Sequence, residues 1–179
     1  MLAINWTNVA RGWWLPLLAL NITGCGLTQH ISDGSKSVFN AVFYQSVKVL
    51  HLDFTAREAL NTDTKENQAF SVPVVLRIYQ LTDRQQFDQL SYEALLKNGD
   101  SLLKNDRLTQ QDRVLKPGGD VSLDMPMETE TRFVAVVGLF RDPDQNQQRW
   151  KLVMLRSDLD PNLPRIVEVA NNTLTLLPR

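Results

Sequence analysis

The stretch "SVPVVLRIYQL", residues 71–81, decides the fold class of this chain. It is rich in β-branched and aromatic residues, which favour strands. Its side chains alternate between two faces, with Val74, Leu76 and Ile78 on one and Val75, Arg77 and Tyr79 on the other. A period of two residues is that of a β-strand. Pro73 fits the first turn or an edge position of such a strand.

Strand patterns recur on both sides of this stretch. Upstream, "SVKVLHLDFTA" (46–56) places Leu50, Leu52 and Phe54 on one face and His51 on the other. Downstream, short apolar stretches are separated by Pro, Gly, Asn and Asp: "VLKPGGDVSLDM" (114–125), "RFVAVVGLF" (132–140), "RWKLVML" (149–155), "RIVEVA" (165–170) and "TLTLL" (173–177). Strands at this spacing predict a β-sandwich, and Asn171-Asn172 predicts a tight turn in its last hairpin.

Two segments depart from the strand pattern. Thr82 to Gln85 has the spacing of a helix capping box, and apolar residues follow near helical spacing as far as Asn98-Gly99, where a helix can end. By contrast, "REALNTDTKENQAF" (57–70) has neither period, and we expect a long loop. The sequence therefore predicts a mainly β fold, a two-sheet sandwich with a short helical insertion and one long loop.

The N-terminus carries the pattern of an exported and acylated protein. The apolar run "WWLPLLAL" (13–20) is too short to span a bilayer, which needs about 20 residues, but it matches the core of a secretory signal. It leads into Ile22-Thr23-Gly24-Cys25, which resembles the lipobox of bacterial lipoproteins. Small side chains admit the peptidase, and the thiol of Cys25 accepts the lipid as a thioether. The alternative is a buried segment with an inert cysteine.

These features predict three parts of the chain. We expect residues 1–24 to be a signal peptide, residues 25–45 to be the acylated N-terminus and a flexible tether, and residues 46–179 to be one folded domain. Gly26 follows the acylated cysteine where an aspartate usually retains bacterial lipoproteins in the inner membrane. The sequence therefore predicts an anchor in the outer membrane, on its periplasmic face.

Composition and motifs give little sign of catalysis. The chain has 19 basic and 20 acidic residues, so its charge does not suggest nucleic acid as a partner. Its two histidines are His30, in the expected tether, and His51, so a catalytic triad would depend on His51 alone. "DPDQNQ" (142–147) begins like a calcium loop but lacks the required glycine and glutamate, and we interpret it as a hairpin connection. We expect no enzymatic activity, no metal and no cofactor.

Several stretches together resemble the TssJ family, the outer-membrane lipoproteins of type VI secretion systems. They are "SVPVVLRIYQL", the spaced Phe87 and Leu90 with Tyr92 to Leu95, "LKPGG", "VAVVGLFRD" and Trp150. With the lipobox, the resemblance covers nearly the whole expected mature chain. One departure is Gly138-Leu139 before Phe140, where the family commonly has an alanine.

The resemblance implies a transthyretin-like sandwich of two four-stranded sheets anchored in the inner leaflet of the outer membrane. It implies a structural role in a TssJ–TssL–TssM complex through which TssD-like tube components pass, with the periplasmic C-terminal region of TssM as the direct partner. In this family the loop between the first two strands takes part in that contact, which here corresponds to residues 57–70. The candidate partner-binding residues are Glu58, Ala59, Leu60, Asn61, Asp63, Lys65, Glu66 and Asn67.

Within this set, Leu60 is the expected apolar anchor amid polar side chains, a mixture typical of specific interfaces. Two alternatives remain open from the residues themselves. The loop could lack a partner altogether. The protein could instead be a lipid-anchored binding module for a small ligand or a cell-wall fragment, held between the sheets or on the same loop.

Overall fold

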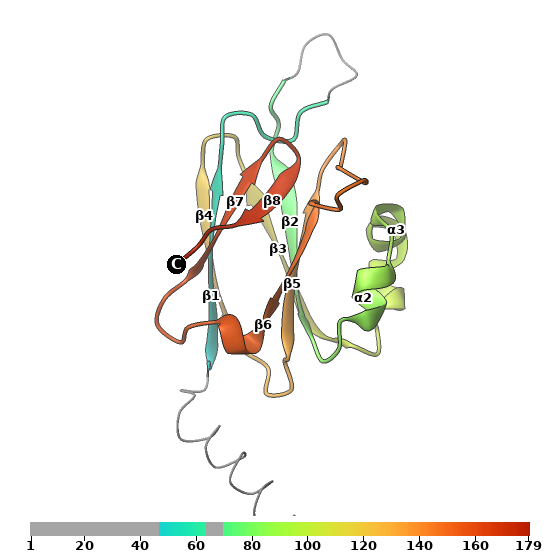
Figure 1. Ribbon diagram of the computed structural model, residues 1–179, viewed down its shortest axis with the longest axis vertical. Coiled ribbons are helices and arrows are strands. Elements are labelled where there is room, and N and C mark those ends of the chain that lie inside the picture. The colour runs from blue at the N-terminus through green and yellow to red at the C-terminus, as the bar shows by residue number, and fades with distance from the viewer. Residues whose placement is uncertain (1–46, 64–69) are drawn as a thin grey trace, which may run out of the picture. The chain divides into compact units, whose positions relative to one another are not determined.

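The computed structural model describes residues 47–63 and 70–179, which form a sandwich of two four-stranded β-sheets (Figure 1). The strands are β1 (Val49–Ala56), β2 (Val74–Leu81), β3 (Arg107–Leu115), β4 (Asp120–Pro126), β5 (Phe133–Leu139), β6 (Lys151–Leu155), β7 (Arg165–Ala170) and β8 (Thr173–Leu176). The first sheet has the order β4-β1-β7-β8 and the second β3-β2-β5-β6. The predicted mainly β sandwich is confirmed.

All neighbouring strands are antiparallel except β1 and β7, which run parallel with Leu52 opposite Arg165. The predicted inward faces are confirmed, because Leu50, Leu52 and Phe54 of β1 and Leu76 and Ile78 of β2 are fully buried. These side chains fill the space between the sheets and supply the main stabilisation through burial of apolar surface.

The strand β3 begins seven residues before the strand signal at Val114. Residues 107–113 are mostly polar, which hid the strand in the sequence. The physical reason is position: β3 is an edge strand that pairs only with β2, so its side chains need not be apolar. Asp112 lies opposite Arg77 and forms a 2.9 Å ion pair with it across the two strands.

The single predicted helical insertion is two helices, α2 (Gln85–Gln89) and α3 (Tyr92–Leu102). The predicted capping box at Thr82 to Gln85 is wrong, because the side chain that caps is Ser91, which accepts a bond from Ala94 N at 3.2 Å. The predicted end at Asn98-Gly99 coincides with a break in the helix, because Asn98 has non-helical backbone angles. The helix kinks at Asn98 and continues to Leu102, with Gly99 packed so closely on the sheet that an added Cβ would lie 3.2 Å from the Tyr79 hydroxyl.

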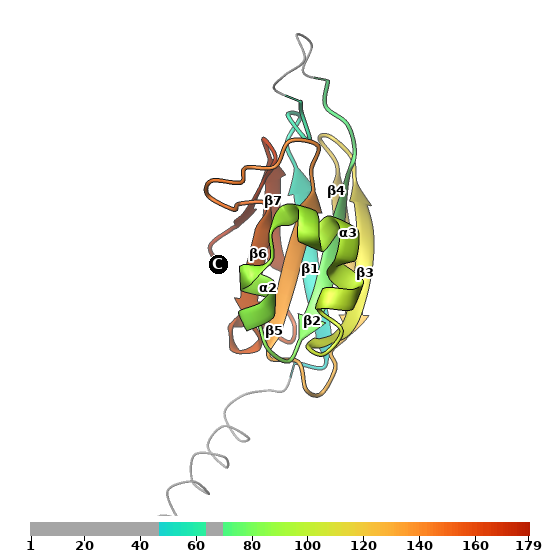
Figure 2. The same cartoon turned by 90° about the vertical axis from the view of Figure 1, so that its right-hand side faces the viewer.

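Both helices cover the outer face of the second sheet (Figure 2). Phe87 of α2 packs edge-on against Tyr79, and Tyr92 of α3 packs edge-on against Trp150 with ring centres 5.2 Å apart. The Tyr92 hydroxyl donates to the Phe140 carbonyl, and burial raises the pKa of Tyr92 to about 12. The helices therefore make a second apolar layer that hides Trp150 and Tyr79.

The two ends of the sandwich differ. At the entry end, which contains Val47, the 3₁₀ turn η1 (Arg156–Asp158) and the connection 159–164, Arg156 Nη2 donates to the Val47 carbonyl at 2.9 Å. The opposite end, here called the loop end, contains residues 57–63, residues 70–73 and the turn at 171–172 (Figure 1). Asn171 and Asn172 have φ of 46° and 61°, which confirms the predicted tight turn between β7 and β8.

Candidate partner-binding site

The described parts of the long loop are tied to one another at its base. The Leu60 carbonyl accepts a bond from Val72 N at 3.2 Å, and Leu60 N donates to the Ser71 hydroxyl at 3.3 Å. Asn61 Nδ2 donates to the Pro73 carbonyl at 2.9 Å. The chain therefore leaves β1 and enters β2 through one shared set of hydrogen bonds.

Two buried asparagines join this base to the rest of the loop end. Asn61 Oδ1 accepts a bond from Arg141 N at 2.7 Å, and Asn172 Nδ2 donates to the carbonyls of Thr62 at 2.7 Å and Asp142 at 2.9 Å. Both residues have positive φ, 48° for Asn61 and 61° for Asn172, a conformation that asparagine tolerates better than most side chains. Asn61 and Asn172 therefore fix the position of the loop relative to β5 and β7.

The role expected for Leu60 as an exposed apolar anchor is wrong, because its side chain is 0% exposed and belongs to the core. An exposed apolar residue of this loop is instead Phe70, which is 65% exposed and lies at the other end of the same loop. Phe70 lies at the end of the predicted loop 57–70, but it is absent from the candidate residues because Leu60 is the expected apolar anchor there. A large aromatic residue in a polar segment is the signal that could have found it.

The other predicted residues lie in different environments. Glu58 and Ala59 are exposed, Asn61 is buried, and Asp63 is half-buried with its carboxylate 3.7 Å from the Arg141 guanidinium. Lys65, Glu66 and Asn67 lie outside the described residues, as does the lipidation site Cys25. Of the predicted residues, Glu58 and Ala59 are therefore exposed at the surface, next to the hydrogen-bonded base of the loop.

A shallow hollow of about 520 Å³ lies beside this base and is lined by Ala56, Arg57, Glu58, Ala59 and Gly118. Gly118 N donates to the Arg57 carbonyl at 3.3 Å, and Arg57 pairs with Glu168 at 2.8 Å. Gly118 has φ of 65°, and a Cβ there would lie 2.7 Å from Glu58 Oε1. A glycine is therefore required for the turn to approach the loop.

We predict that Gly118→Ala lowers the free energy of unfolding by about 1–2 kcal/mol, since a side chain is strained at positive φ and displaces the Glu58 carboxylate. Chemical denaturation measures the change. Lys116→Ala in the same turn is the control, because Lys116 is exposed and should change stability by less than about 0.5 kcal/mol. Equal stability of Gly118→Ala and the control would contradict the assigned role of the glycine.

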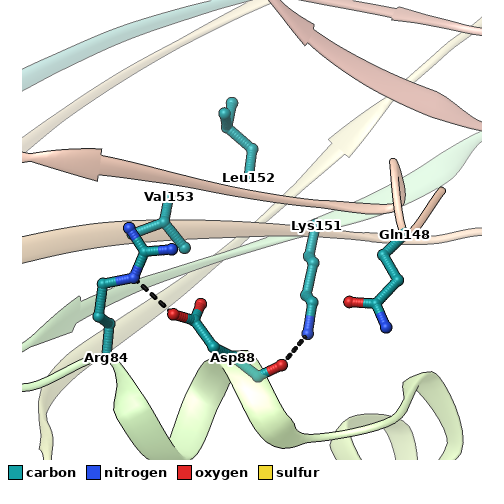
Figure 3. Close-up of a pocket in the computed structure, with 6 residues that line it drawn as sticks. All are labelled: Arg84, Asp88, Gln148, Lys151, Leu152 and Val153. Atoms are coloured by element: carbon teal, nitrogen blue, oxygen red, sulfur yellow. Dashed lines mark hydrogen bonds and ion pairs between the residues drawn. The ribbon is translucent and has the colours of Figure 1, made fainter.

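A second hollow, of about 330 Å³, lies between α2 and β6 (Figure 3). Arg84 pairs with Asp88 at 2.6 Å, and Lys151 Nζ donates to the carbonyls of Phe87, Asp88 and Leu90 at 2.8 to 3.4 Å. Burial lowers the pKa of Lys151 from its ordinary value. The polar groups here satisfy one another and hold the C-terminal end of α2 to the sheet, so the hollow has a structural explanation.

The sequence matches a family model over residues 48–172, described as type VI secretion lipoprotein, VasD, EvfM, TssJ and VC_A0113. The match spans the sandwich from β1 to the turn between β7 and β8. The chain belongs to this type VI secretion lipoprotein family. The expected family, a family of type VI secretion lipoproteins, is thereby confirmed.

Solved structures give the same relationship. One chain, from the structure of the T6SS protein TssM C-terminal domain (869–1107) from EAEC, is 43% identical with a TM-score of 0.67, over 74% of this chain and 100% of that one. A chain from a type VI membrane complex is 44% identical with a TM-score of 0.69, over 74% and 99%. Serratia marcescens Lip, a membrane-bound component of the type VI secretion system, shares the fold at 16% identity and a TM-score of 0.65, over 75% and 100%. The comparison with curated proteins found no match.

The family member described here shows no assembled catalytic group in residues 47–63 and 70–179. His51 Nδ1 contacts the Asp124 carboxylate across β1 and β4, and in that part of the chain no hydroxyl group bonds to either residue. Asp144 accepts bonds from Asn146 N and Gln147 N, which supports a hairpin connection at 142–147 rather than a calcium loop. Those residues also contain neither a metal-binding group of His, Cys, Asp and Glu nor a helix long and apolar enough to cross a membrane.

Proposed function

We propose that this lipoprotein is a structural component of the type VI secretion membrane complex, anchored to the periplasmic face of the outer membrane by acyl chains on Cys25. In this proposal residues 1–24 are removed, residues 25–45 form the acylated tether, and residues 46–179 form the domain that binds the periplasmic C-terminal region of TssM. The observation that carries it is the identity of 43% and 44% to chains from structures of the TssM C-terminal domain and of a type VI membrane complex. The proposed role involves no catalysis.

The geometry of the loop end supports the proposed partner contact. Asn61 and Asn172 fix the base of the loop, so its exposed groups are presented with little loss of conformational freedom on binding. Those groups combine an exposed aromatic ring, Phe70, with the charged side chains of Arg57 and Glu58. An aromatic anchor surrounded by polar groups is typical of a specific interface.

The alternative function, a lipid-anchored module that binds a small ligand between the sheets, is not supported by the interior of the sandwich. Leu50, Leu52, Phe54 and Leu76 are each 0% exposed, so apolar side chains fill the space between the sheets where a small ligand was expected. The hollow beside Glu58 and Gly118 is open to solvent and adjoins the loop. This arrangement favours contact with a partner protein over enclosure of a small molecule.

We predict that Phe70→Ser weakens binding of the periplasmic region of TssM at least about fivefold, since the loss of an exposed aromatic anchor typically costs more than about 1 kcal/mol. Titration of the purified partner into the mature chain measures the affinity. The matched control is Leu163→Ser, because Leu163 is also an exposed apolar residue, 61% accessible, but lies in the connection 159–164 at the entry end. The control should bind as the wild type does.

A second variant separates the loop from the fold. Replacing residues 64–69 with a Gly/Ser segment of equal length leaves Leu60, Asn61 and Ser71 unchanged, so the hydrogen bonds at the loop base are retained. We expect this variant to lose TssM binding while its melting temperature stays within a few degrees of the wild type. Undiminished binding by both loop variants would overturn the assignment of the loop as the interface.

A further inference from the structure

An arginine occupies the inward face of β7 at the entry end of the sandwich. Val167 and Val169 of this strand are fully buried, and the alternation of side chains places Arg165 on the same face. Arg165 is half-buried, and its strand begins directly after the connection 159–164. The side chain of a permanently charged residue therefore begins on the inward face of the sandwich, where its Nε is buried.

The Nε of Arg165 is buried and has no hydrogen-bond partner within residues 47–63 and 70–179. Other arginines differ sharply. Arg77 is bound by both oxygens of Asp112, and Arg156 donates to four backbone carbonyls. Buried polar groups in proteins nearly always have a partner, and a charged donor without one is costly. The position of Arg165 therefore calls for an acceptor from outside the described chain.

A hollow of about 450 Å³ lies next to Arg165, at the seam between the edge strands β6 and β8, and is here called the seam hollow. Leu174 N donates to the Arg149 carbonyl at 2.7 Å and joins the two edges toward the loop end. The seam hollow is lined by Val153, Met154, Ser157, Asp158, Arg165, Leu176 and Arg179. Its volume lies in the range of ligand sites. We call its apolar lining residues, Val153, Met154 and Leu176, the apolar wall, and its polar lining residues, Ser157, Asp158, Arg165 and Arg179, the polar wall.

The polar wall carries a net positive charge. Arg165 and Arg179 supply two guanidinium groups, and Asp158 supplies one carboxylate. Asp158 Oδ1 accepts a bond from the Ser157 hydroxyl at 3.2 Å, and Arg179 Nη2 donates to the Asp158 main-chain carbonyl at 2.6 Å. The fork of a guanidinium binds the oxygens of a phosphate or carboxylate group in pairs. The wall is therefore suited to an oxyanion.

We propose that the seam hollow binds a phosphate group, either in the headgroup of a phospholipid or as free phosphate, with Arg165 and Arg179 as its ligands. The half-buried apolar residues Val153 and Leu176 also line the hollow and suit the first methylenes of a lipid. Two exposed apolar residues, Leu155 (44%) and Leu163, flank the same end of the sandwich. The inference that the bound phosphate belongs to a phospholipid rests on the proposed membrane anchoring. The inference that the hollow binds a phosphate group does not.

The location adds to the case for a lipid. Arg156 donates to the carbonyl of Val47, so η1 lies at the end at which the described chain begins (Figure 1). Ser157 and Asp158 of η1 line the seam hollow, which therefore adjoins this end. In the proposed function, the acylated segment enters at this end. A phospholipid bound in the seam hollow would hold the entry end against the lipid surface to which Cys25 is attached.

The test uses the mature chain from residue 25 with Cys25→Ser, so that acyl chains cannot themselves bind lipid. The ¹H–¹⁵N signal of Arg165 Nε is followed by NMR during titration with inorganic phosphate and, separately, with a short-chain phosphatidylglycerol below its micelle concentration. We expect the signal to shift in both titrations, with the lipid binding at least about tenfold more tightly because it also contacts the apolar wall. Arg165→Gln should weaken binding of both probes at least about tenfold.

Two further variants keep the outcome decisive. Arg113→Gln removes an arginine from β3, outside the seam hollow, and should bind both probes as the wild type does. Arg165→Met should fold with an equal or higher melting temperature, since it removes a buried donor that has no protein partner, yet it should lose phosphate binding. If the Arg165 signal shifts with inorganic phosphate but not with phosphatidylglycerol, the phosphate site is supported and the phospholipid is excluded as its ligand. An unshifted signal in both titrations overturns the proposal.

Discussion

Cells that carry Cys25→Ser in place of the wild-type protein should fail to secrete through the type VI system, while the variant itself folds and remains in the periplasm. A serine hydroxyl cannot take the lipid as a thioether, so the anchor is lost. Each buried methylene of an acyl chain contributes about 0.8 kcal/mol, so two or more long chains hold a protein on a membrane stably and their absence releases it. Secreted tube protein in the medium and fractionation of the envelope measure the two effects.

Two controls test whether secretion is lost because the lipid anchor is missing, rather than because the domain is altered or the protein is sent to the wrong membrane. Intact mass of the membrane-extracted wild type should show a chain that starts at Cys25 and carries acyl chains, and the mass of Cys25→Ser should show neither lipid nor change in residues 46–179. Gly26→Asp should keep the lipid but move the protein to the inner membrane, again with loss of secretion. Normal secretion by Cys25→Ser would refute the anchoring role.

The second large effect is expected from Asn61→Ala. This change removes two hydrogen bonds, to the Pro73 carbonyl and from Arg141 N, and places alanine at a φ of 48°. Each buried group left unpaired costs about 1–3 kcal/mol, and the left-handed conformation adds about 1 kcal/mol. We expect a decrease of about 3–5 kcal/mol in the free energy of unfolding, measured by chemical denaturation, together with weaker TssM binding.

A matched variant divides this effect into its two causes. Asn61→Gly also removes the hydrogen bonds but accepts positive φ without strain, so it should be more stable than Asn61→Ala by about 1 kcal/mol. Glu58→Ala, at an exposed position of the same loop, should leave stability unchanged. If both Asn61 variants were as stable as the wild type, the loop base would not depend on this side chain.

The strands with alternating apolar residues were predictable because one face of each must be buried. This holds for Leu50, Leu52 and Phe54 in β1 and for the first half of β2. It fails for residues 107–113 of β3, where an edge position removes the need for alternation. It also fails at the helices, because the segment forms two helices and only α3 has a side-chain cap, Ser91. Phe87 and Tyr92 of these helices pack against Tyr79 and Trp150, contacts that the local sequence does not contain.

The candidate site was predictable as a segment but not as a surface. The absence of a period located residues 57–70, and Glu58 and Ala59 are indeed exposed there. Local sequence could not show that Leu60 turns into the core, since that depends on packing from both sheets. It also could not show that Asn172, more than one hundred residues away along the chain, donates to the Thr62 carbonyl and holds the loop.

The parallel pairing of β1 with β7 has a consequence for the order of events in the cell. The first strand of the domain lies in the middle of its sheet, between β4 and β7, and β7 precedes only the final hairpin partner. Contacts so distant along the chain form slowly and require almost the entire sequence. The polypeptide therefore cannot complete its sandwich until nearly all of it has been synthesised. If residues 1–24 direct export as proposed, this delay keeps the chain unfolded while it crosses the inner membrane.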